Sequence, residues 1–452
     1  MSDASFDLIV VGGGSGGLAG AFRAASHGAR VALLEPGALG GTCVNVGCVP
    51  KKAMWLAAEL AHKSALARQL GFDLPEHPAL DWIEFIADRQ RYIENIHASY
   101  RRRLDAAGIA LLPRRGRLVA ADTVACSDGV RVRAPHILLA TGGHPVRPRV
   151  PGAEHGIDSD GFFQLTAAPA RVAIVGAGYI AVELAGVLQA LGSRVELFVR
   201  GRRLLESFDP ELAAQLGEDY RQQGIHAHFG HALASVQRDD DGRVRLVDAA
   251  GAATEPFDTL IFATGRRPNG DGLGLDEAGV ARDARGFVVV DAQQRTSVPG
   301  IHAIGDLTPQ VALTPVAIAA ARRLMDRLFG GQADAKIELA DVATVVFSHP
   351  PIARVGLGET EARARFGDDV HVLSTNFRPM LHALADSPQR SLFKLVCVGE
   401  ERRVVGIHLL GEGADEMLQG VAVALKRGIT LQDLHDTIAI HPTSAEEVVL
   451  MR

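Results

Sequence analysis

One segment of the chain, residues 7–35, carries the pattern of a complete βαβ unit. A short apolar run at residues 8–11, predicted to be a strand, leads into a glycine-rich loop at residues 12–17, an alanine-rich helical stretch follows, and a second apolar run ends at Glu35. Two parallel strands joined by a helix are stable only within a larger parallel sheet that is covered by helices. The segment therefore predicts an α/β fold.

The spacing of the glycines in this loop is that of a dinucleotide-binding turn. Gly12 allows a tight turn, Gly14 lets a pyrophosphate approach the backbone, and Gly17 allows the helix to pack closely on the strand. The phosphates would lie at the helix N-terminus, while the Glu35 carboxylate would accept hydrogen bonds from ribose hydroxyls and repel an added 2′-phosphate. A glycine triplet alone is weak evidence, but here the strand, the helix and the acid are all in place.

The same pattern returns at residues 171–200. An apolar strand at residues 171–175 leads into Gly176 and Gly178, a helical stretch follows, and the second strand ends in Arg200, with Arg203 close behind. The chain is therefore predicted to bind two dinucleotides. A guanidinium at this strand end suits the 2′-phosphate of NADP, and an arginine-rich surface loop is the alternative interpretation.

A similar strand-to-turn signal follows each of the two units. The first reaches Thr141 and Gly142, and the second reaches Gly265. Further along, another strand runs toward Asp306, and Thr314 opens a helix. These positions could hold the rest of a bound cofactor, although a turn without a ligand is the simpler interpretation of Asp306 taken alone.

Two cysteines five residues apart, Cys43 and Cys48, lie in the run GGTCVNVGCVPKK at residues 40–52. A disulfide between near neighbours closes too small a loop to stabilise a long chain appreciably, which favours a chemical role. The proline and the two lysines that follow predict a strained turn opening a helix, where the helix dipole and nearby cations would stabilise a thiolate. Cys126 and Cys397 lie in strand-like apolar runs and are predicted to be buried and inert.

The pattern changes from about residue 340 to alternating strands followed by amphipathic helices, with no phosphate loop. Near the end of the sequence, His441 precedes a proline and is followed by Glu446. A histidine oriented by a carboxylate can shuttle protons near neutral pH, whereas an isolated His-Pro pair is more often structural.

The composition excludes several classes of protein. A net charge of −6 provides no global basic field for nucleic acid, and four cysteines are too few for a disulfide framework. No apolar run approaches membrane-spanning length, and the acidic residues 1–7 lack the pattern of a signal peptide. We expect a cytoplasmic protein with no nucleic-acid or membrane partner and no metal site.

Together these motifs resemble the flavoprotein disulfide reductases over essentially the whole chain, and within them they are most similar to the glutathione reductases. Besides the cysteine run, the markers are GAGYIAVELAG at 176–186, FSHPP at 347–351 and HPTSAEE at 441–447. Lipoamide dehydrogenases, by comparison, usually carry Pro-Ser-Lys after the second cysteine and an acid at the end of the second nucleotide strand. This chain has neither feature.

The resemblance implies an α/β fold with two Rossmann-like dinucleotide-binding domains, one for FAD and one for NADPH, and a C-terminal α+β dimerisation domain. The expected boundaries are 1–143 for the first part of the FAD-binding domain, 144–268 for the NADPH-binding domain, 269–338 for the second, central part of the FAD-binding domain, and 339–452 for the dimerisation domain.

The resemblance also implies a homodimer in which electrons pass from NADPH through FAD to the Cys43–Cys48 disulfide and then to glutathione disulfide. Cys43 would be the interchange thiol that forms the mixed disulfide with substrate, and Cys48 the charge-transfer thiol against the flavin. His441 of the partner subunit would be the acid/base, and Glu446 would orient it.

Further positions match residues that hold cofactors or substrate in the family. Those matching FAD-binding residues are Gly12, Gly14, Ser15, Gly17, Glu35, Thr42, Lys51, Thr141, Gly142, Asp306 and Thr314. Those matching NADPH-binding residues are Gly176, Gly178, Tyr179, Ile180, Glu183, Arg200, Arg203 and Gly265. Lys51 and Glu183 match a pair close to the flavin, and Tyr179 matches an aromatic lid over its ring. Those matching substrate-binding residues are Ser15, Tyr100 and Arg322.

Three positions depart from the family pattern. Phe22 stands where some relatives place arginine and Leu381 where some place tyrosine, which predicts a weaker hold on the anionic ends of the substrate. Glu206 replaces a second arginine that often binds the NADP phosphate, so the degree of NADPH preference stays open. Two alternatives to glutathione-disulfide reduction also stay open: reduction of another low-molecular-weight disulfide, such as a modified glutathione, and a flavin-bearing redox sensor without physiological turnover.

Overall fold

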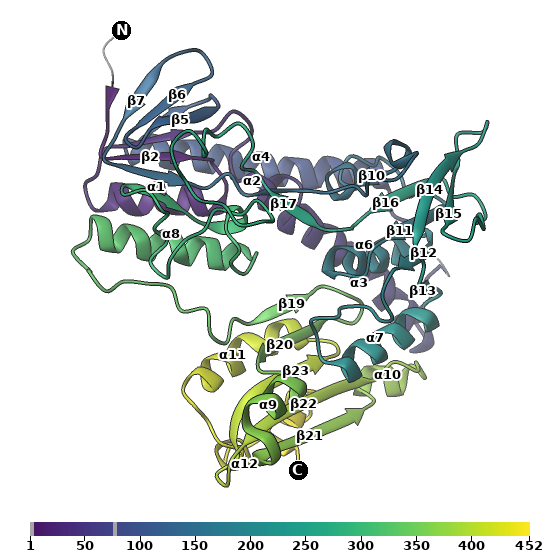
Figure 1. Cartoon of the computed structure of the whole chain (residues 1–452). Coiled ribbons are helices and arrows are strands. Elements are labelled where there is room, and N and C mark those ends of the chain that lie inside the picture. Colours follow the sequence, from purple (N-terminus) through teal and green to yellow (C-terminus); the bar gives the residue numbers. More distant parts are fainter. Residues whose placement is uncertain (1–3, 76–78) are drawn as a thin grey trace. The chain divides into compact units, whose positions relative to one another are not determined.

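The computed structural model describes residues 4–75 and 79–452, and the chain divides into two compact units (Figure 1). Unit 1 comprises the chain up to Lys51, Glu84–Val146 and Gly265–Leu339, and unit 2 comprises Lys52–Ile83, Arg147–Thr264 and Ala340–Arg452. The first three residues of the acidic N-terminal segment lie outside the described residues.

A five-stranded parallel sheet forms the centre of unit 1. In spatial order its strands are β18 (Ile301–Ala303), β8 (His136–Leu139), β2 (Leu8–Val11), β3 (Val31–Leu34) and β4 (Ala110–Leu112). The strand predicted at residues 8–11 is confirmed as β2. Because both faces of such a sheet are covered, its strands are continuous apolar runs instead of alternating ones.

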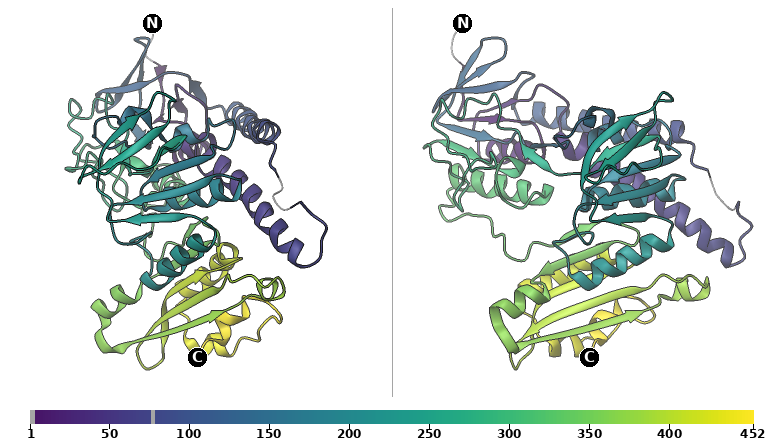
Figure 2. Two further views of the ribbon diagram at one scale, coloured as in Figure 1. Left: turned by 90° about the vertical axis from the view of Figure 1, so that its right-hand side faces the viewer. Right: turned by 45° about the vertical axis from the view of Figure 1, so that its right-hand side comes forward.

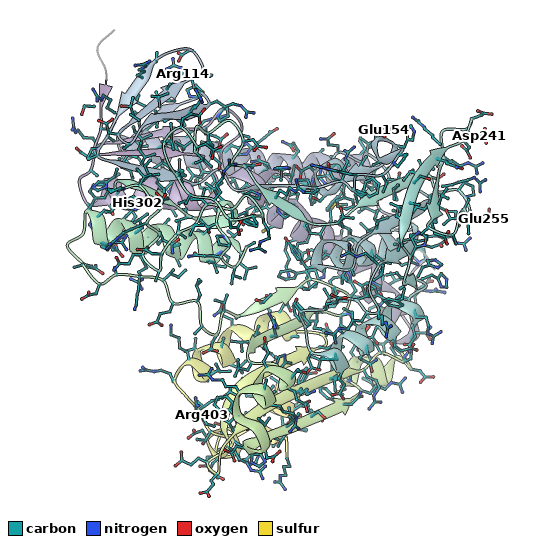
Figure 3. The ribbon with its side chains drawn as sticks, viewed as in Figure 1. Arg114, Glu154, Asp241, Glu255, His302 and Arg403 are labelled. Carbon is teal, nitrogen blue, oxygen red and sulfur yellow. The ribbon has the colours of Figure 1, made fainter. Side chains whose placement is uncertain are left out.

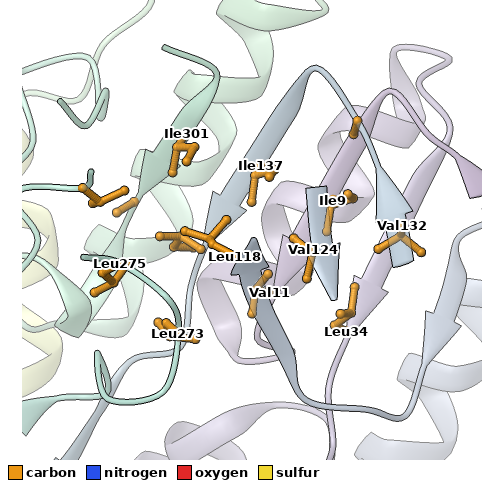
Figure 4. Close-up of a cluster of buried hydrophobic side chains, with 14 of the residues drawn as sticks. Ile9, Val11, Leu34, Leu118, Val124, Val132, Ile137, Leu273, Leu275 and Ile301 are labelled. Carbon is orange, nitrogen blue, oxygen red and sulfur yellow. The ribbon is translucent and has the colours of Figure 1, made fainter. Parts of the chain in front are cut away.

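Successive side chains of β2 enter two different cores. Ile9 and Val11 pack with Leu118 and Val124 of a smaller four-stranded sheet (Figure 4). The strands of that sheet are β1 (Ala4–Ser5), β7 (Arg131–Arg133), β6 (Thr123–Cys126) and β5 (Gly116–Ala120). On the opposite face, Leu8 and Val10 belong to a cluster formed with α1 (Ser15–Ser26), α4 (Trp82–Ala106) and α8 (Thr314–Leu328). Both cores are therefore fixed by the strand period of two.

A second parallel sheet forms the nucleotide-fold part of unit 2. Its strands in spatial order are β10 (Ile157–Asp158), β16 (Thr259–Phe262), β11 (Arg171–Val175), β12 (Arg194–Val199) and β13 (His226–Phe229). The helices here are η1 (Ala153–His155), α5 (Ser159–Phe162), α6 (Tyr179–Ala190) and α7 (Pro210–Gln222). A hairpin of β14 (Leu233–Arg238) and β15 (Val244–Asp248) carries Asp241 in its turn (Figure 3).

The C-terminal part of unit 2 is built on an antiparallel sheet, coloured green to yellow in Figure 2. Its strands in spatial order are β19 (Thr344–Val346), β20 (Ile352–Gly356), β23 (Arg403–Leu410), β22 (Ser391–Val398) and β21 (Val370–Phe377). The helices are α9 (Glu359–Phe366), η3 (Gly367–Asp369), α10 (Met380–Leu384), α11 (Ala414–Lys426), α12 (Leu431–His435) and α13 (Glu446–Leu450). Helices α11 to α13 share one hydrophobic cluster with the sheet, and α9 shares another.

A buried lysine links the two parts of unit 2. The Lys394 ammonium, on β22, lies 2.8 Å from Glu359 Oε2 and 3.0 Å from Asp209 Oδ2, and its side chain is 5% exposed. Asp209 also caps α7 by accepting hydrogen bonds from the backbone N–H groups of Glu211 and Leu212. Because a buried charge needs its partners, this cluster holds the start of α7 against the C-terminal sheet.

The predicted fold class is confirmed, with two Rossmann-like sheets and a C-terminal α+β part. Cys126 and Cys397 are buried in β6 and β22, as predicted. The four domain boundaries stay a prediction. In residues 4–75 and 79–452, no helix is both long and apolar enough to cross a membrane, and no group of three or more histidine, cysteine or acidic side chains is arranged to hold a metal ion.

Candidate active site

The first glycine-rich loop joins β2 to α1 without room for side chains. Gly12 has φ +110°, and a Cβ there would lie 2.4 Å from the Ala140 carbonyl oxygen. A Cβ on Gly17 would lie 1.9 Å from the Gly12 carbonyl oxygen. The close helix-to-strand packing predicted for Gly17 is therefore confirmed, and α1 begins at Ser15 directly after the turn.

Glu35 fixes the shape of this loop from the end of β3. Its carboxylate accepts a hydrogen bond from the Gly13 N–H (2.7 Å) and another from the Gly37 N–H (2.8 Å). The carboxylate thus lies beside the phosphate loop and remains partly exposed, as a ribose-binding acid must be.

The segment with the two cysteines is attached to the phosphate loop. The Gly40 N–H donates to the Gly13 carbonyl (2.8 Å), and α2 (Gly41–Asn45) follows at once. The Asn45 amide donates to the Gly41 carbonyl (2.8 Å) and accepts a hydrogen bond from His97 Nε2 (2.8 Å). His97 lies on α4, so a distant helix holds the turn between the cysteines.

Four of the predicted residues meet in unit 1, and three of them are the first residues of helices. Cys43 lies on α2, and Cys48 is the first residue of α3 (Cys48–Gln69); both are thiols in the structure. Thr314, the first residue of α8, places its hydroxyl 3.6 Å from the Cys48 sulfur. The Thr314 and Ser15 hydroxyls also form hydrogen bonds with the Cys43 sulfur. Thr42, beside Cys43, is exposed.

Groups of the same chain shift the pKa of Cys43 in both directions. The hydrogen bond with Cys48 raises the pKa of Cys43 most, burial and the charge of Cys48 raise it further, and the Thr314 and Ser15 hydroxyls oppose them. Cys43 therefore holds its proton more firmly than a free thiol does. It is Cys48 that occupies the helix start, which is the position where the dipole favours a thiolate.

The two lysines after Cys48 lie in different surroundings. Lys51, half-buried in the first turn of α3, belongs to unit 1. Within unit 2, the Lys52 ammonium lies 3.2 Å from Asp415 Oδ2 and 3.6 Å from the ring centroid of Trp55. Lys52 is therefore engaged with its own unit, and no sequence motif predicted these partners.

The strand-end motifs of unit 1 are joined by two residues that the sequence argument missed. Thr141 Oγ1 donates to the Asn269 carbonyl (2.8 Å), and the Asn269 amide donates back to the Thr141 carbonyl (2.9 Å). Arg266, on β17 (Arg266–Pro268), donates to the Gly143 carbonyl of β9 (Gly143–Pro145) and lies 3.5 Å from the carboxylate of Asp306. Asp306 lies on η2 (Gly305–Leu307). The bonds of Asn269 with Thr141 and of Arg266 with Gly143 join chain segments more than a hundred residues apart.

Open backbone remains beside these motifs. Gly142 and Gly265 both have positive φ, and a Cβ on either would meet no atom within 4 Å. Exposed peptide groups at the carboxyl ends of parallel strands are where an open α/β sheet binds its ligand.

Tyr100 lies on α4 close to the cysteine pair. Burial raises the pKa of Tyr100, the nearby Cys43 charge adds to this, and Arg103 opposes it. The Arg103 guanidinium lies 4.5 Å from the ring centroid of Phe22, on α1. Arg322 is exposed on α8. Sequence reasoning singled out Tyr100, Arg322 and Phe22 but not Arg103.

The second glycine-rich loop repeats the first in unit 2. Gly176 has φ +149°, and a Cβ there would lie 2.4 Å from the Ala263 carbonyl oxygen. At Gly178 a Cβ would meet no atom within 4 Å, so the backbone is open at the start of α6. Tyr179 and Ile180 form the first turn of that helix, and the Tyr179 side chain is largely exposed.

Glu183 lies one turn further along α6 and is buried. Its carboxylate accepts a hydrogen bond from the Phe347 N–H at 2.9 Å, which ties α6 to the FSHPP segment of the same unit. Lys51, the predicted partner of Glu183, belongs to unit 1.

The turn after β12 contains both basic and acidic groups. Arg200 is exposed, and Arg203 donates to the Glu206 carbonyl at 2.7 Å. The Glu206 carboxylate folds back over the same turn, because its Oε1 lies 2.4 Å from where a Cβ on Gly201 would be. A carboxylate therefore lies next to the residue predicted to read a 2′-phosphate.

His441 and Glu446 form the predicted pair. His441 Nδ1 lies 3.0 and 3.1 Å from the two carboxylate oxygens of Glu446, the first residue of α13. The His441 side chain is 78% exposed and that of Glu446 is 14% exposed. Because Nδ1 faces the carboxylate, Nε2 is the nitrogen that can exchange protons with another molecule. Ile438 and Ile440, beside it, are also largely exposed.

Comparison with known proteins agrees with this geometry. The family described as pyridine nucleotide-disulphide oxidoreductase matches residues 6–321, and the dimerisation domain of that family matches residues 342–452. The chain belongs to the pyridine nucleotide-disulphide oxidoreductases. It is 44% identical over 457 residues to the glutathione reductase of Schizosaccharomyces pombe, and this alignment covers 99% of the present chain and 98% of the relative. It is 42% identical over 464 residues to the glutathione reductase of Yarrowia lipolytica, with 99% of each chain covered.

Family membership explains why the two loops and the cysteine pair occur together, but it leaves the roles of single residues untested. Leu381, the third departure from the family pattern, is half-buried on α10 between the exposed side chains of Met380 and Leu384. The supporting residues His97, Asn269 and Arg266 had no local signal, since each acts on a segment far away in sequence.

Proposed function

We propose that this oxidoreductase reduces glutathione disulfide with NADPH, as an FAD-containing homodimer in the cytoplasm. One observation carries the proposal. The Cys43 and Cys48 thiols meet beside the first phosphate loop, where the Ser15 and Thr314 hydroxyls reach the Cys43 sulfur. The full-length similarity to two glutathione reductases supports the choice of substrate.

The residues of unit 1 fit a flavin dinucleotide. The turn at Gly12 and the start of α1 would hold the pyrophosphate, and Glu35 would hold the ribose. The backbone at Gly142 and the end of the strand at Asp306 are placed to hold the remaining part. Bound FAD would supply the two-electron step between the nicotinamide and the cysteine disulfide.

The cysteine pair would carry out two thiol–disulfide exchanges. Cys43 loses its proton and attacks one sulfur of glutathione disulfide, which forms a mixed disulfide and releases the first glutathione as a thiolate. Cys48 then attacks the Cys43 sulfur, which re-forms the intrachain disulfide and releases the second glutathione. The raised pKa of Cys43 supports a need for a base in the first step and for an acid when each thiolate leaves.

We assign that role to His441 of the partner subunit. The exposed ring, its Nδ1 contact with Glu446 and its place in the dimerisation domain support this assignment. The carboxylate would keep the proton on Nδ1, so Nε2 would accept the proton of the Cys43 thiol and return it to the leaving thiolate.

The second loop would hold NADPH. Arg200 and Arg203 would neutralise the 2′-phosphate, and the open backbone at Gly178 would approach the pyrophosphate. Tyr179 would cover the flavin ring until the nicotinamide arrives, and Lys51 with Glu183 would lie close to the flavin. The Glu206 carboxylate weakens the phosphate site, so we expect a smaller preference for NADPH over NADH than two arginines alone would produce.

The test is steady-state oxidation of NADPH, and separately of NADH, by the purified holoenzyme with glutathione disulfide. Cys43→Ser should abolish turnover while FAD stays bound, because the interchange thiol is lost. His441→Ala should slow disulfide reduction far more than flavin reduction, which stopped-flow absorbance separates. Failure of glutathione disulfide to support fast NADPH oxidation by the unaltered enzyme would overturn the proposal.

A second substrate class has one observation in its favour. Phe22 places an aromatic side chain on α1 where relatives of the family can carry a cation, which would suit a glutathione with blocked carboxylates. The surroundings of Phe22 decide between the two substrates.

A further inference from the structure

We infer that Arg103 is the carboxylate-binding residue of the substrate site in unit 1, and that it makes the enzyme selective for disulfides with free carboxylates. The inference rests on the proposed function, since it takes Cys43 as the place where the disulfide reacts. It concerns a residue outside every motif of the sequence.

The position of Arg103 is set by two neighbours. On α4, Arg103 follows Tyr100 by three positions, so the two side chains share one face of the helix. Tyr100 is close enough to Cys43 for the charge of that sulfur to raise the pKa of Tyr100, and Arg103 lowers it. The guanidinium therefore lies on the Tyr100 side of the thiol where the disulfide exchange takes place.

Phe22 holds the guanidinium in place. The Arg103 carbon that bears the three nitrogens lies 4.5 Å from the centroid of the Phe22 ring, which is a cation–π contact between α4 and α1. A guanidinium above an aromatic ring is less free to rotate and can still donate hydrogen bonds to a carboxylate. Phe22 is thus an apolar residue that orients a cation from another helix, the Arg103 guanidinium on α4.

Two other arginines, one on α1 and one on α8, share a buried carboxylate. Arg23 and Arg323 both pair with Asp326, whose side chain is only 4% exposed. Within residues 4–75 and 79–452, neither Arg103 nor Arg322 forms an ion pair with a carboxylate of the chain. Arg103 is therefore a cation without a carboxylate partner among the described residues, and it lies on the helix face that carries Tyr100.

A guanidinium at this position favours a disulfide that carries free carboxylates. Glutathione disulfide carries carboxylates on flexible arms around its central sulfurs, and a guanidinium binds a carboxylate through two parallel hydrogen bonds. A disulfide with amidated carboxyl groups would lack this bond and would leave the cation uncompensated. Arg103 thus favours glutathione disulfide over the amidated alternative that Phe22 alone suggested.

The experiment compares Arg103→Gln with the unaltered holoenzyme on two substrates, glutathione disulfide and the disulfide of glutathione amidated at both carboxyl groups. We expect kcat/KM for glutathione disulfide to fall about tenfold, mainly through a higher KM, because a charge-assisted bond made equally in the ground and transition states is lost. For the amidated substrate kcat/KM should change less than twofold. The ratio of kcat/KM for glutathione disulfide to that for the amidated disulfide should therefore fall sharply.

Two further variants separate a specific contact from a general loss of charge. Arg102→Gln removes the same charge from the neighbouring position, which faces away from Tyr100, and should leave the substrate ratio within about twofold of that of the unaltered enzyme. Arg103→Lys keeps the charge without the planar fork and should recover part of the ratio. In the unaltered enzyme, added salt should raise the KM for glutathione disulfide but not for the amide.

An equal loss on both substrates in Arg103→Gln would overturn the inference, and so would an equal collapse of the ratio in Arg102→Gln. Fast turnover of glutathione disulfide by the unaltered enzyme would sustain the proposed function in either case. Slow turnover of glutathione disulfide with fast turnover of the amide would instead overturn both the proposed function and the role of Arg103.

Discussion

Glu59, on α3 in unit 2, is a half-buried acid whose removal should stabilise the protein at alkaline pH. Its carboxylate lies 3.5 Å from His349 Nε2, and its side chain is 20% exposed. Burial raises the pKa of Glu59 to about 7, Lys63 opposes this, and Glu412 raises it further. A protonated Glu59 can donate a hydrogen bond to the neutral imidazole of His349.

The sign of the pH dependence follows from the raised pKa. Between pH 4.5, the ordinary value for this group, and about pH 7, the folded protein binds more protons at Glu59 than the unfolded chain does. The contribution of Glu59 to the free energy of unfolding therefore falls as the pH rises through this window. Screening at this partly exposed site limits the loss to about 1–3 kcal/mol at pH 8.

Glu59→Gln should therefore be more stable than the unaltered protein at pH 8, by about 1–3 kcal/mol, and nearly equal to it at pH 4.5. The two neighbouring histidines have lowered pKa values, about 4 for His62 and about 3 for His349, because both are buried. The contribution of these histidines to the free energy of unfolding rises with pH up to about their ordinary pKa. It cancels in the difference between Glu59→Gln and the unaltered protein because both proteins contain the two histidines.

Thermal unfolding of the holoenzyme, followed by tryptophan fluorescence from pH 4.5 to pH 8, measures this difference. Trp55 stacks against His349 at 5.7 Å and so reports directly on the site. As a control, Glu218→Gln should show the opposite sign, since hydrogen bonds from Arg221 and Gln222 lower the pKa of Glu218 to about 2. A gain for Glu59→Gln that does not change between the two pH values, or a loss at pH 8, would refute the reasoning.

Three other results are expected. Gly17→Ala should lose bound FAD, measured as flavin absorbance per subunit, because its Cβ would overlap the rigid Gly12 carbonyl. As a control, a Cβ on Gly217 meets nothing within 4 Å, so Gly217→Ala should keep FAD and raise the free energy of unfolding by up to about 1 kcal/mol. In a His441→Ala dimer, mass spectrometry can measure the rate at which reduced Cys43 is alkylated. This rate should still increase with pH at pH 9, and a rate that stops increasing below pH 8 would contradict the raised pKa of Cys43. Glu206→Gln should increase the NADPH-to-NADH ratio of kcat/KM about three- to tenfold, and an unchanged ratio would place the carboxylate outside the phosphate site.

Much of the fold follows from local patterns in the sequence. The runs at β2 and β11 were predicted to the residue, because a strand buried on both faces is a continuous apolar run bounded by glycine. The cysteine pair and His441 with Glu446 were found because each is a short motif whose members lie within a few residues of one another. In the structure, His441 Nδ1 lies 3.0 Å from a carboxylate oxygen of Glu446.

The residues that sequence reasoning missed share a different property. His97 holds Asn45 from 52 positions away, and Asn269 holds Thr141 from 128 positions away. Neither has a neighbour in sequence that would mark it, since its partner is chosen by the packing of helices and strands. The pKa of Cys43 could not be read from local sequence for the same reason, because the surroundings of that sulfur come from α1, α3 and α8.

The sequence by itself determined the two nucleotide folds, the cysteine pair and the pairing of His441 with Glu446, since glycine spacing, strand periodicity and short motifs act over a few residues of chain. Only the tertiary structure decided how the groups of this site are charged and oriented. Burial and neighbouring dipoles set the pKa of Cys43. The cation beside Phe22 comes from Arg103, on a helix 81 positions further along the chain, because side chains meet through packing in space and not through their order in the sequence.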